Sequence, residues 1–225
     1  MRARAAFLWA SGAALLLAGA PVGVGAQAAG SAQAAAALMD RASARYRDTA
    51  SLCSDFTQHL SVPLLGQEQT GRGRFCSQRP DKFALRFTEP AGDLVVGDGT
   101  WVWAYYPSMD AKQVLRFPAA RAPGGFDFYT EFLEGWAAKY QVTPEGAETV
   151  AGRPTQRLRL VPKAGSPGQA VVVWLEAEGV LRQLRVEEEN GSVRTVTLTS
   201  ADMGTAPPAS WFTFTPPRGA QIIGG

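Results

Sequence analysis

The stretch from Gly71 to Pro107 decides the fold, and it reads GRGRFCSQRPDKFALRFTEP followed by AGDLVVGDGTWVWAYYP. Large apolar side chains alternate along it with smaller or polar ones, which is the period-two pattern of β-strands. Asp98-Gly99 predicts a two-residue hairpin turn, because a type I′ turn needs positive φ at both central residues. A sheet so rich in aromatic side chains either buries them in an ordinary core or uses them to bind an apolar ligand.

The segments on either side of this stretch continue the strand pattern. Residues 54–62 and 67–78 predict a hairpin whose turn lies near Leu64-Leu65-Gly66. Further strands are predicted at residues 112–117, 140–144, 155–161, 169–176, 180–188 and 192–199. The pattern as a whole predicts a mainly β fold, in which one antiparallel sheet of about ten strands curls and helices close one side.

Two amphipathic helices are predicted beside the sheet. Apolar residues recur at spacings of four in each: Leu38, Ala42 and Tyr46 in the first, and Phe128, Phe132 and Trp136 in the second, over residues 126–139. The aromatic stripe of the second helix suits an ordinary core-facing helix as well as a helix that covers a ligand.

The N-terminus predicts export. Arg2 and Arg4 precede an apolar run from residue 7 to residue 20, and Val24-Gly25-Ala26 fits a cleavage site after Ala26. No cysteine lies near that site, so the sequence predicts a soluble exported protein, located in the periplasm if the source has two membranes. Residues 27–225 then form one domain with 20 basic and 20 acidic residues, a balance that gives no sign of a nucleic-acid partner.

Two cysteines, Cys53 and Cys76, remain after the signal peptide. A symmetric register about the turn at residues 64–66 places them opposite each other, and an exported protein meets an oxidising compartment. We therefore predict a disulfide, with two separate buried thiols as the alternative.

Motifs for catalysis and metal binding are missing from the sequence. His59 is the one histidine, and strand alternation places it away from the Phe56 face, toward solvent. The sequence has no nucleophile elbow, no phosphate-binding loop and no metal-ligand spacing. The chain is therefore expected not to be an enzyme and to need no cofactor or metal.

Several short motifs follow one another in a specific order and spacing. They are Ser54–Gln58 (SDFTQ), Gly71–Phe75 (GRGRF), Arg79–Phe83 (RPDKF), Glu89-Pro90, Val95–Gly99 (VVGDG), Trp101–Tyr105 (WVWAY) and Phe212–Gly219 (FTFTPPRG). Together they resemble the LolA family of periplasmic lipoprotein carriers, and the resemblance covers almost all of the chain beyond the signal. Leu85 departs from the family pattern, in which many relatives have an aromatic residue at that position.

The resemblance implies an incomplete, unclosed antiparallel β-barrel of about ten to eleven strands covered by an α-helical lid. The concave apolar side of such a barrel receives acyl chains. The expected cavity lining comprises Phe56, Phe75, Phe83, Leu85, Phe87, Trp101, Trp103, Tyr105, Phe128 and Phe132. Arg79, in the family's R-P step, is expected to latch the lid through hydrogen bonds to helical carbonyls; a structural cap without a switching role is the alternative.

The function implied by the resemblance is that of a periplasmic chaperone. Such a protein shields the acyl chains of lipoproteins and carries them from the inner to the outer membrane. Its implied partners are acylated lipoproteins, an inner-membrane lipoprotein-releasing ABC transporter and, where one exists, an outer-membrane acceptor lipoprotein, and the carrier itself is expected to be a monomer. A carrier or sensor of another lipid or glycolipid on the same fold is the alternative.

Overall fold

The computed structural model describes residues 24–121, 126–164, 170–187 and 190–224. Residues 1–23 of the expected signal peptide lie outside this part of the chain, so the signal and the domain boundary stay predictions. Four α-helices are described: α1 (Val24–Arg47), α2 (Pro107–Asp110), α3 (Phe128–Phe132) and α4 (Trp136–Lys139). Short 3₁₀ turns lie at η1 (Pro63–Leu65), η2 (Ala119–Arg121) and η3 (Ala209–Phe212).

The strands of the described residues form one 13-stranded sheet. They are β1 (Ser51–Val62), β2 (Gln67–Gln78), β3 (Lys82–Glu89), β4 (Leu94–Asp98), β5 (Trp101–Tyr105), β6 (Gln113–Pro118), β7 (Tyr140–Val150), β8 (Arg153–Pro162), β9 (Ala170–Leu175), β10 (Leu181–Glu187), β11 (Val193–Leu198), β12 (Asp202–Met203) and β13 (Gln221–Ile223). Neighbouring strands are antiparallel except for the parallel pair β13 and β6.

The sheet is curved but not closed. Its order is β13-β6-β5-β4-β3-β2-β1-β11-β10-β9-β8-β7, so β13 and β7 are the two edges, and the short β12 pairs with β1. The predicted fold class, an unclosed antiparallel sheet with a helical cover, is confirmed. The strand count exceeds the expected ten to eleven, because the sequence pattern gave no signal for the very short β12 and β13.

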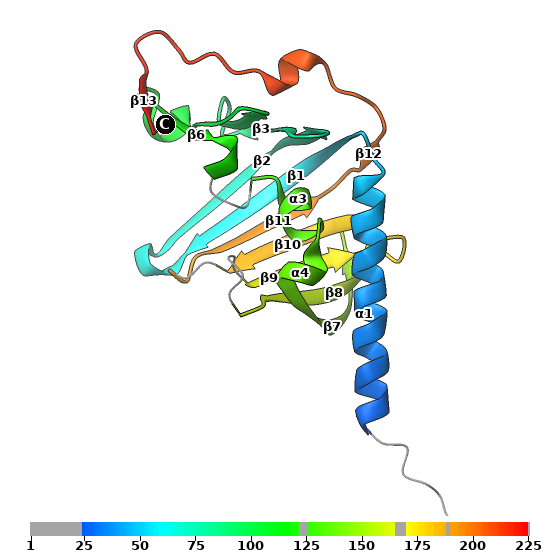
Figure 1. Cartoon of the computed structure of the whole chain (residues 1–225). Coiled ribbons are helices and arrows are strands. Elements are labelled where there is room, and N and C mark those ends of the chain that lie inside the picture. Colours follow the sequence, from blue (N-terminus) through cyan, green and yellow to red (C-terminus); the bar gives the residue numbers. More distant parts are fainter. Residues whose placement is uncertain (1–23, 122–125, 165–169, 188–189, 225) are drawn as a thin grey trace, which may run out of the picture.

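One face of the sheet carries the main apolar core, and we call it the inner face. Strand register places Phe75, Leu85, Val95 and Ala104 side by side across β2 to β5 on this face, since paired residues on neighbouring strands point to the same side. Leu158 and Val173 continue the face on β8 and β9, and all six residues belong to one buried cluster. Figure 1 shows α3 and α4 in front of the strands and α1 along one end of the sheet.

The predicted hairpin of β1 and β2 is confirmed in detail. Cys53 pairs with Cys76 in the strand register, and the two sulfurs form a disulfide. Both cysteines are buried on the opposite, outer face, next to Ala84 and Val96. The disulfide therefore joins the two strands of this hairpin and forms part of the apolar cluster on the outer face.

The first helix lies against the far half of the sheet. Leu38, Met39 and Ala42 bury the stripe predicted for this helix in the main core. Arg41 Nε donates to the carbonyl oxygen of Ala177 at 3.0 Å, in the turn between β9 and β10. A Cβ atom at Gly179 would lie 2.7 Å from the Ala42 nitrogen, so only glycine allows this turn to approach the helix so closely.

The C-terminal segment crosses the outer face of β3 to β5. Phe212 is buried there with Leu94 and Val96, while Phe214 stacks beside Tyr105 with ring centroids 5.5 Å apart. The Arg86 guanidinium holds the segment by donating to the carbonyl oxygen of Trp211 at 2.9 Å from Nη2. The FTFTPPRG motif therefore covers the outer face of β3 to β5, and the helices lie against the inner face.

Candidate functional site

Seven of the predicted cavity residues meet on the inner face. Phe56, Phe75, Phe83, Leu85, Phe87, Phe128 and Phe132 all lie in or against the main apolar cluster. Their rings contact one another across elements: Phe75 on β2 lies 4.6 Å from Phe128 on α3, and Phe56 meets Phe87 edge-on at 5.1 Å between centroids. The sheet and the helices thus share one aromatic layer, which we call the inner layer.

The other three predicted cavity residues, Trp101, Trp103 and Tyr105, face the opposite way. Trp103 pairs with Val96, which belongs to the outer cluster, whereas Val102 pairs with Gly97 opposite Phe83. The physical reason is the register set by the Asp98-Gly99 turn, which puts the even-numbered residues of β5 on the inner face. Their assignment to the cavity is therefore wrong.

A cation–π stack occupies the outward side of β5. The guanidinium carbon of Arg116 lies 4.2 Å from the Trp101 ring centroid and 5.5 Å from that of Trp103. Trp103 Nε1 donates to Asp98 Oδ2 at 3.0 Å, and its ring contacts Phe214. These aromatic side chains fix the hairpin and the C-terminal segment on the outer face and take no part in the inner layer.

The cover of the inner layer begins at a capped helix. Asp127 caps α3, accepting from the Thr130 backbone nitrogen at 3.3 Å and from its hydroxyl at 2.8 Å. Tyr46 of α1 shares a hydrogen bond with the same Thr130 hydroxyl at 3.1 Å. Its ring stacks on Tyr129 with centroids 5.0 Å apart, so α1 and α3 are joined by one polar and one aromatic contact.

The predicted second helix over residues 126–139 is interrupted. Gly135 adopts φ 61, a left-handed conformation that ends the helical run, and the chain forms two short helices, α3 and α4. The break lets Trp136 turn toward α1, where its indole nitrogen donates to Asp40 Oδ1 at 3.1 Å. The two short helices are thus joined to α1 by separate side-chain contacts, those of α3 at Tyr46 and that of α4 at Asp40.

Arg79 lies between the sheet and this cover, but not with the contacts that were expected. Its guanidinium carbon sits 4.7 Å from the Tyr46 ring centroid, and Nη2 lies 3.7 Å from Glu134 Oε2. Among the described residues, its buried Nε and Nη2 have no hydrogen-bond partner, so the expected bonds to helical carbonyls are absent there. The side chain still touches α1 and the α3–α4 connection at once.

Burial perturbs the titration of the polar groups under the cover. Burial raises the pKa of Tyr46 to about 12, and the nearby Asp127 carboxylate contributes to the same shift. Burial also raises the pKa of Asp127, although hydrogen bonds from Thr130 oppose the shift. The hydroxyl of Tyr129 is buried without a hydrogen-bond partner among the described residues. The cover therefore contains polar groups whose burial is only partly offset by hydrogen bonding.

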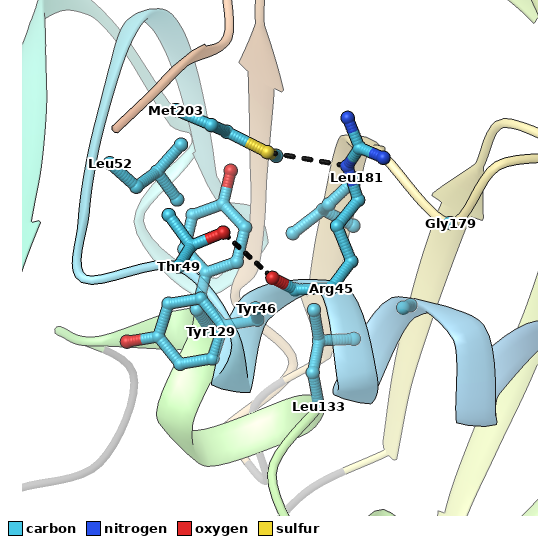
Figure 2. A pocket seen from close by; sticks show the side chains of 10 residues that line it. Arg45, Tyr46, Thr49, Leu52, Tyr129, Leu133, Gly179, Leu181 and Met203 are labelled. Carbon is cyan, nitrogen blue, oxygen red and sulfur yellow. Dashed lines mark hydrogen bonds between the residues drawn. The ribbon is translucent and has the colours of Figure 1, made fainter. Parts of the chain in front are cut away.

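The inner layer is closely packed, because four of its rings are each at most 2% exposed: Phe56, Phe75, Phe128 and Phe132. Beside it, the space between α1, α3 and the β9–β10 turn has a volume of about 10 Å³, close to what a single water molecule requires. Figure 2 shows this space lined by Arg45, Tyr46, Thr49, Leu52, Tyr129, Leu133, Gly179, Leu181 and Met203, together with Ala42. Pockets for drug-sized ligands span roughly 300–1,000 Å³, so neither the packed rings nor this space takes an apolar ligand of that size unless the cover moves.

A larger hollow of about 420 Å³ lies on the outer face of β1, β2 and β11. Hydroxyls and charged groups line it, including those of Thr57, Thr195 and Thr197, and Arg72 there pairs with Glu89 at 2.6 Å. His59 is exposed at its edge, as the strand alternation predicted, and lies 2.9 Å from Glu68. Apart from Gly71, the residues that line this hollow have polar or charged side chains, in contrast to the apolar inner layer.

Comparison with known proteins identifies the family. The model for "Outer membrane lipoprotein carrier protein LolA" matches residues 47–215, which is most of the chain. This chain belongs to the LolA family. The outer-membrane lipoprotein carrier protein of Dechloromonas aromatica is 27% identical over 185 residues, covering 79% of this chain and 83% of that protein. The protein of the same description from Vibrio parahaemolyticus is 26% identical and covers 85% and 88% of the two chains.

A solved structure supports the fold of this LolA-family chain. An uncharacterised conserved protein from Thermus thermophilus superimposes with a TM-score of 0.53 at 14% identity, covering 86% of this chain and all of the other. The family description is that of a carrier and not of an enzyme. Within the described ranges, no helix combines the length and apolar character that a membrane crossing requires, and no three metal-binding side chains gather.

Sequence reasoning missed several residues of the LolA-type cover. Tyr46 was placed on the apolar stripe of the first helix, but its contact with Arg79 joins residues 33 positions apart and has no local signal. Tyr129 and Trp136 lie within the predicted aromatic helix, but their partners on α1, Tyr46 and Asp40, are distant in the sequence.

Proposed function

We propose that this protein is a periplasmic carrier that holds the acyl chains of lipoproteins between the inner face of its sheet and helices α1, α3 and α4. It would carry them from the inner membrane to the outer membrane. The observation that carries the proposal is the inner layer itself: aromatic side chains of sheet and helices in one apolar layer, under a cover with few polar attachments. Membership of the LolA family supports the same function.

The energetics of cargo favour such a layer. Exposure of an acyl chain to water costs about 0.8 kcal/mol per methylene, so a chain of about 16 carbons costs on the order of 12 kcal/mol. A soluble carrier must shield most of that surface and must also release it. An apolar layer that closes on itself when empty meets both demands, because the cover recovers part of the lost burial when the cargo leaves.

The cover is the part proposed to move. Its contacts with the sheet include ring contact at Phe75–Phe128 and the Arg79 contacts with Tyr46 and Glu134, and α1 also packs on β7 through apolar side chains. None of these contacts is a strand pairing. Nε and Nη2 of Arg79, which lack a hydrogen-bond partner within the described part of the chain, leave room for a second hydrogen-bonding arrangement when the helices shift. Arg79 is accordingly the proposed latch, and a fixed structural cap is the alternative.

The donor and acceptor proposed for the cargo follow from the family function. An inner-membrane lipoprotein-releasing ABC transporter would load the carrier, and an outer-membrane acceptor lipoprotein, where one exists, would receive the cargo. Lipid extracted from protein purified out of the periplasm and identified by mass spectrometry tests the cargo class. A bound glycolipid would instead support the alternative carrier, and a lipid-indifferent protein would contradict both.

The position of the cargo is tested by photo-cross-linking at two matched sites. A benzophenone-bearing phenylalanine replaces Phe87 on the inner face or Tyr105 on the outer face, both of which are partly buried. With a triacylated lipopeptide, the expected result is cross-linking from position 87 and little from position 105. Equal labelling from both positions would remove the inner layer as the binding site.

A further inference from the structure

The tip of the β1–β2 hairpin exposes two leucines to solvent. Leu64 is 79% exposed and Leu65 is 68% exposed. Exposed turns usually carry polar residues, so two neighbouring exposed leucines are unusual there. Pro63 begins the turn, and Gly66 ends it with φ 60 while its nitrogen donates to the Pro63 carbonyl oxygen at 3.1 Å. The backbone therefore presents the two side chains in a fixed arrangement.

The end of the hairpin extends past β3. Pairing of β2 with β3 ends at Arg72 and Glu89, whereas pairing of β1 with β11 continues to Ser61 and Val193. Figure 1 shows the hairpin reaching away from the end of the sheet where α1 joins β1. A flat surface that approaches from this end can therefore reach the two leucines.

The hairpin end itself carries few charges. Between Leu60 and Gly71 the only charged side chain is that of Glu68, and Arg194 lies opposite Leu60 on β11. The Glu68 carboxylate accepts from the Ser61 hydroxyl at 2.7 Å and lies 2.9 Å from His59 Nε2. The partly compensated charge lowers the cost of bringing the tip into a less polar medium.

A largely apolar strand face links the tip to the inner layer. Leu60 and Val62 are partly buried and share a face of β1 with Phe56, because strand side chains alternate. Phe56 belongs to the main apolar cluster. From the tip inward, this face carries Val62, Leu60, the polar Gln58 and then Phe56.

We propose that the hairpin tip inserts into the surface of a lipid bilayer, with Leu64 and Leu65 at the boundary between headgroups and acyl chains. The inference rests on the proposed carrier function, for which it supplies the place where an acyl chain passes between membrane and protein. Two leucine side chains cover far less than the roughly 800 Å² that each partner buries in a stable protein interface, whereas insertion into a membrane surface needs only a small apolar area. The contact would be weak and transient, as a carrier that leaves the membrane requires.

Vesicle flotation tests this contact. Protein purified from the periplasm is mixed with phosphatidylethanolamine–phosphatidylglycerol vesicles, and the floated fraction is compared for the unaltered chain, the double variant L64S/L65S and the control Met109→Ser. Met109 is 78% exposed and lies elsewhere on the surface, so the control removes an equally exposed apolar side chain. We expect the double variant to lose at least about tenfold in partitioning and the control to keep it.

The same samples separate this inference from the carrier function. Binding of a triacylated lipopeptide in solution is measured without vesicles, and we expect the double variant to bind as the unaltered chain does. Unchanged flotation of the double variant, or an equal loss in the control, would overturn membrane insertion while leaving lipopeptide binding intact. A variant that floats normally but fails to deliver cargo to an acceptor protein would also overturn it, because the tip would then contact protein.

Discussion

Arg79 lies over the ring of Tyr46, with its guanidinium carbon 4.7 Å from the ring centroid, and thereby joins the end of β2 to helix α1. The same guanidinium reaches Glu134 between α3 and α4 at 3.7 Å. One side chain thus contacts both α1 and the α3–α4 connection, so a substitution at Arg79 alters both contacts at once.

Replacing Arg79 tests its role as a latch. Arg79→Leu removes a cation–π contact and an ion pair that together are worth about 1 kcal/mol at this partly exposed site. We expect backbone amides of α3 and α4 to exchange about fivefold faster by hydrogen–deuterium exchange, with impaired cargo delivery. Arg79→Lys keeps the charge without the planar fork and should give an intermediate rate. Normal exchange and delivery in Arg79→Leu would leave Arg79 as a structural cap.

The stacked tyrosines, Tyr46 and Tyr129, give two matched variants with different expected effects on the free energy of unfolding. Tyr129→Phe removes a buried hydroxyl that has no described partner, so we expect the free energy of unfolding to stay the same or rise by about 1 kcal/mol. Tyr46→Phe removes the hydrogen bond with Thr130 and should lower the free energy of unfolding by about 1 kcal/mol. Urea unfolding measures both. Equal destabilisation by the two variants would mean that the Tyr129 hydroxyl is satisfied in solution.

The disulfide is expected to stabilise the β1–β2 hairpin. Cys53 and Cys76 are separated by 23 positions, and closing a loop of that size contributes about 3 kcal/mol to the free energy of unfolding. The double variant C53A/C76A should therefore unfold at a lower temperature than the oxidised chain. Reducing agent should lower the melting temperature of the unaltered chain and leave that of the variant unchanged. Insensitivity of the unaltered chain to reductant would indicate separate thiols.

Acid should weaken the ion pairs on the outer face of β7 to β10. A hydrogen bond from Arg159, at 3.2 Å, lowers the pKa of Glu187 below its usual value of 4.5. A depressed carboxylate pKa stabilises the fold fully above pH 4.5, and this contribution is lost as the pH falls through the lower folded pKa. Glu187→Gln should flatten the dependence of unfolding free energy on pH below that value, and an unchanged slope would argue against the pair.

Arg86 is expected to hold the C-terminal segment on the outer face. Its guanidinium donates to the carbonyl oxygens of Trp211 and Thr213, each at 2.9 Å. Arg86→Met keeps the apolar stem but loses these bonds, and we expect faster proteolysis near residues 205–215. Arg72→Met, which removes an exposed ion pair elsewhere on the same face, serves as the control and should leave the cleavage rate unchanged. Cleavage at the same rate in both variants would mean that burial of Phe212, and not the Arg86 hydrogen bonds, keeps the segment on the sheet.

The sequence was sufficient for features whose determinants lie close together in the chain. The hairpin register that pairs Cys53 with Cys76 followed from one turn, and strand alternation was enough to place His59 toward solvent. The break at Gly135 was missed because the apolar spacing of four continues across it, and only the positive φ reveals the interruption.

The candidate site was harder to predict, because it depends on contacts between distant segments. Trp103 and Tyr105 face outward, where Phe214 packs on both of them from the end of the chain. A strand whose two faces are both apolar gives no local sign of which face turns inward. The direction was decided by pairing across Gly97 and Val102, and the contact of Arg79 with Tyr46 likewise appears only once β2 lies against α1.

The packing of α1 against late strands of the sheet has a consequence for the order of folding. The helix is synthesised early, yet it packs on β7 and on the β9–β10 turn, where Gly179 touches Ala42 and Ala177 accepts from Arg41. These partners follow it by about a hundred residues or more, so loop closure delays their meeting. The part of the molecule that covers the apolar face is made first and docks late, and the nascent chain must keep that face from other proteins until its second half has emerged.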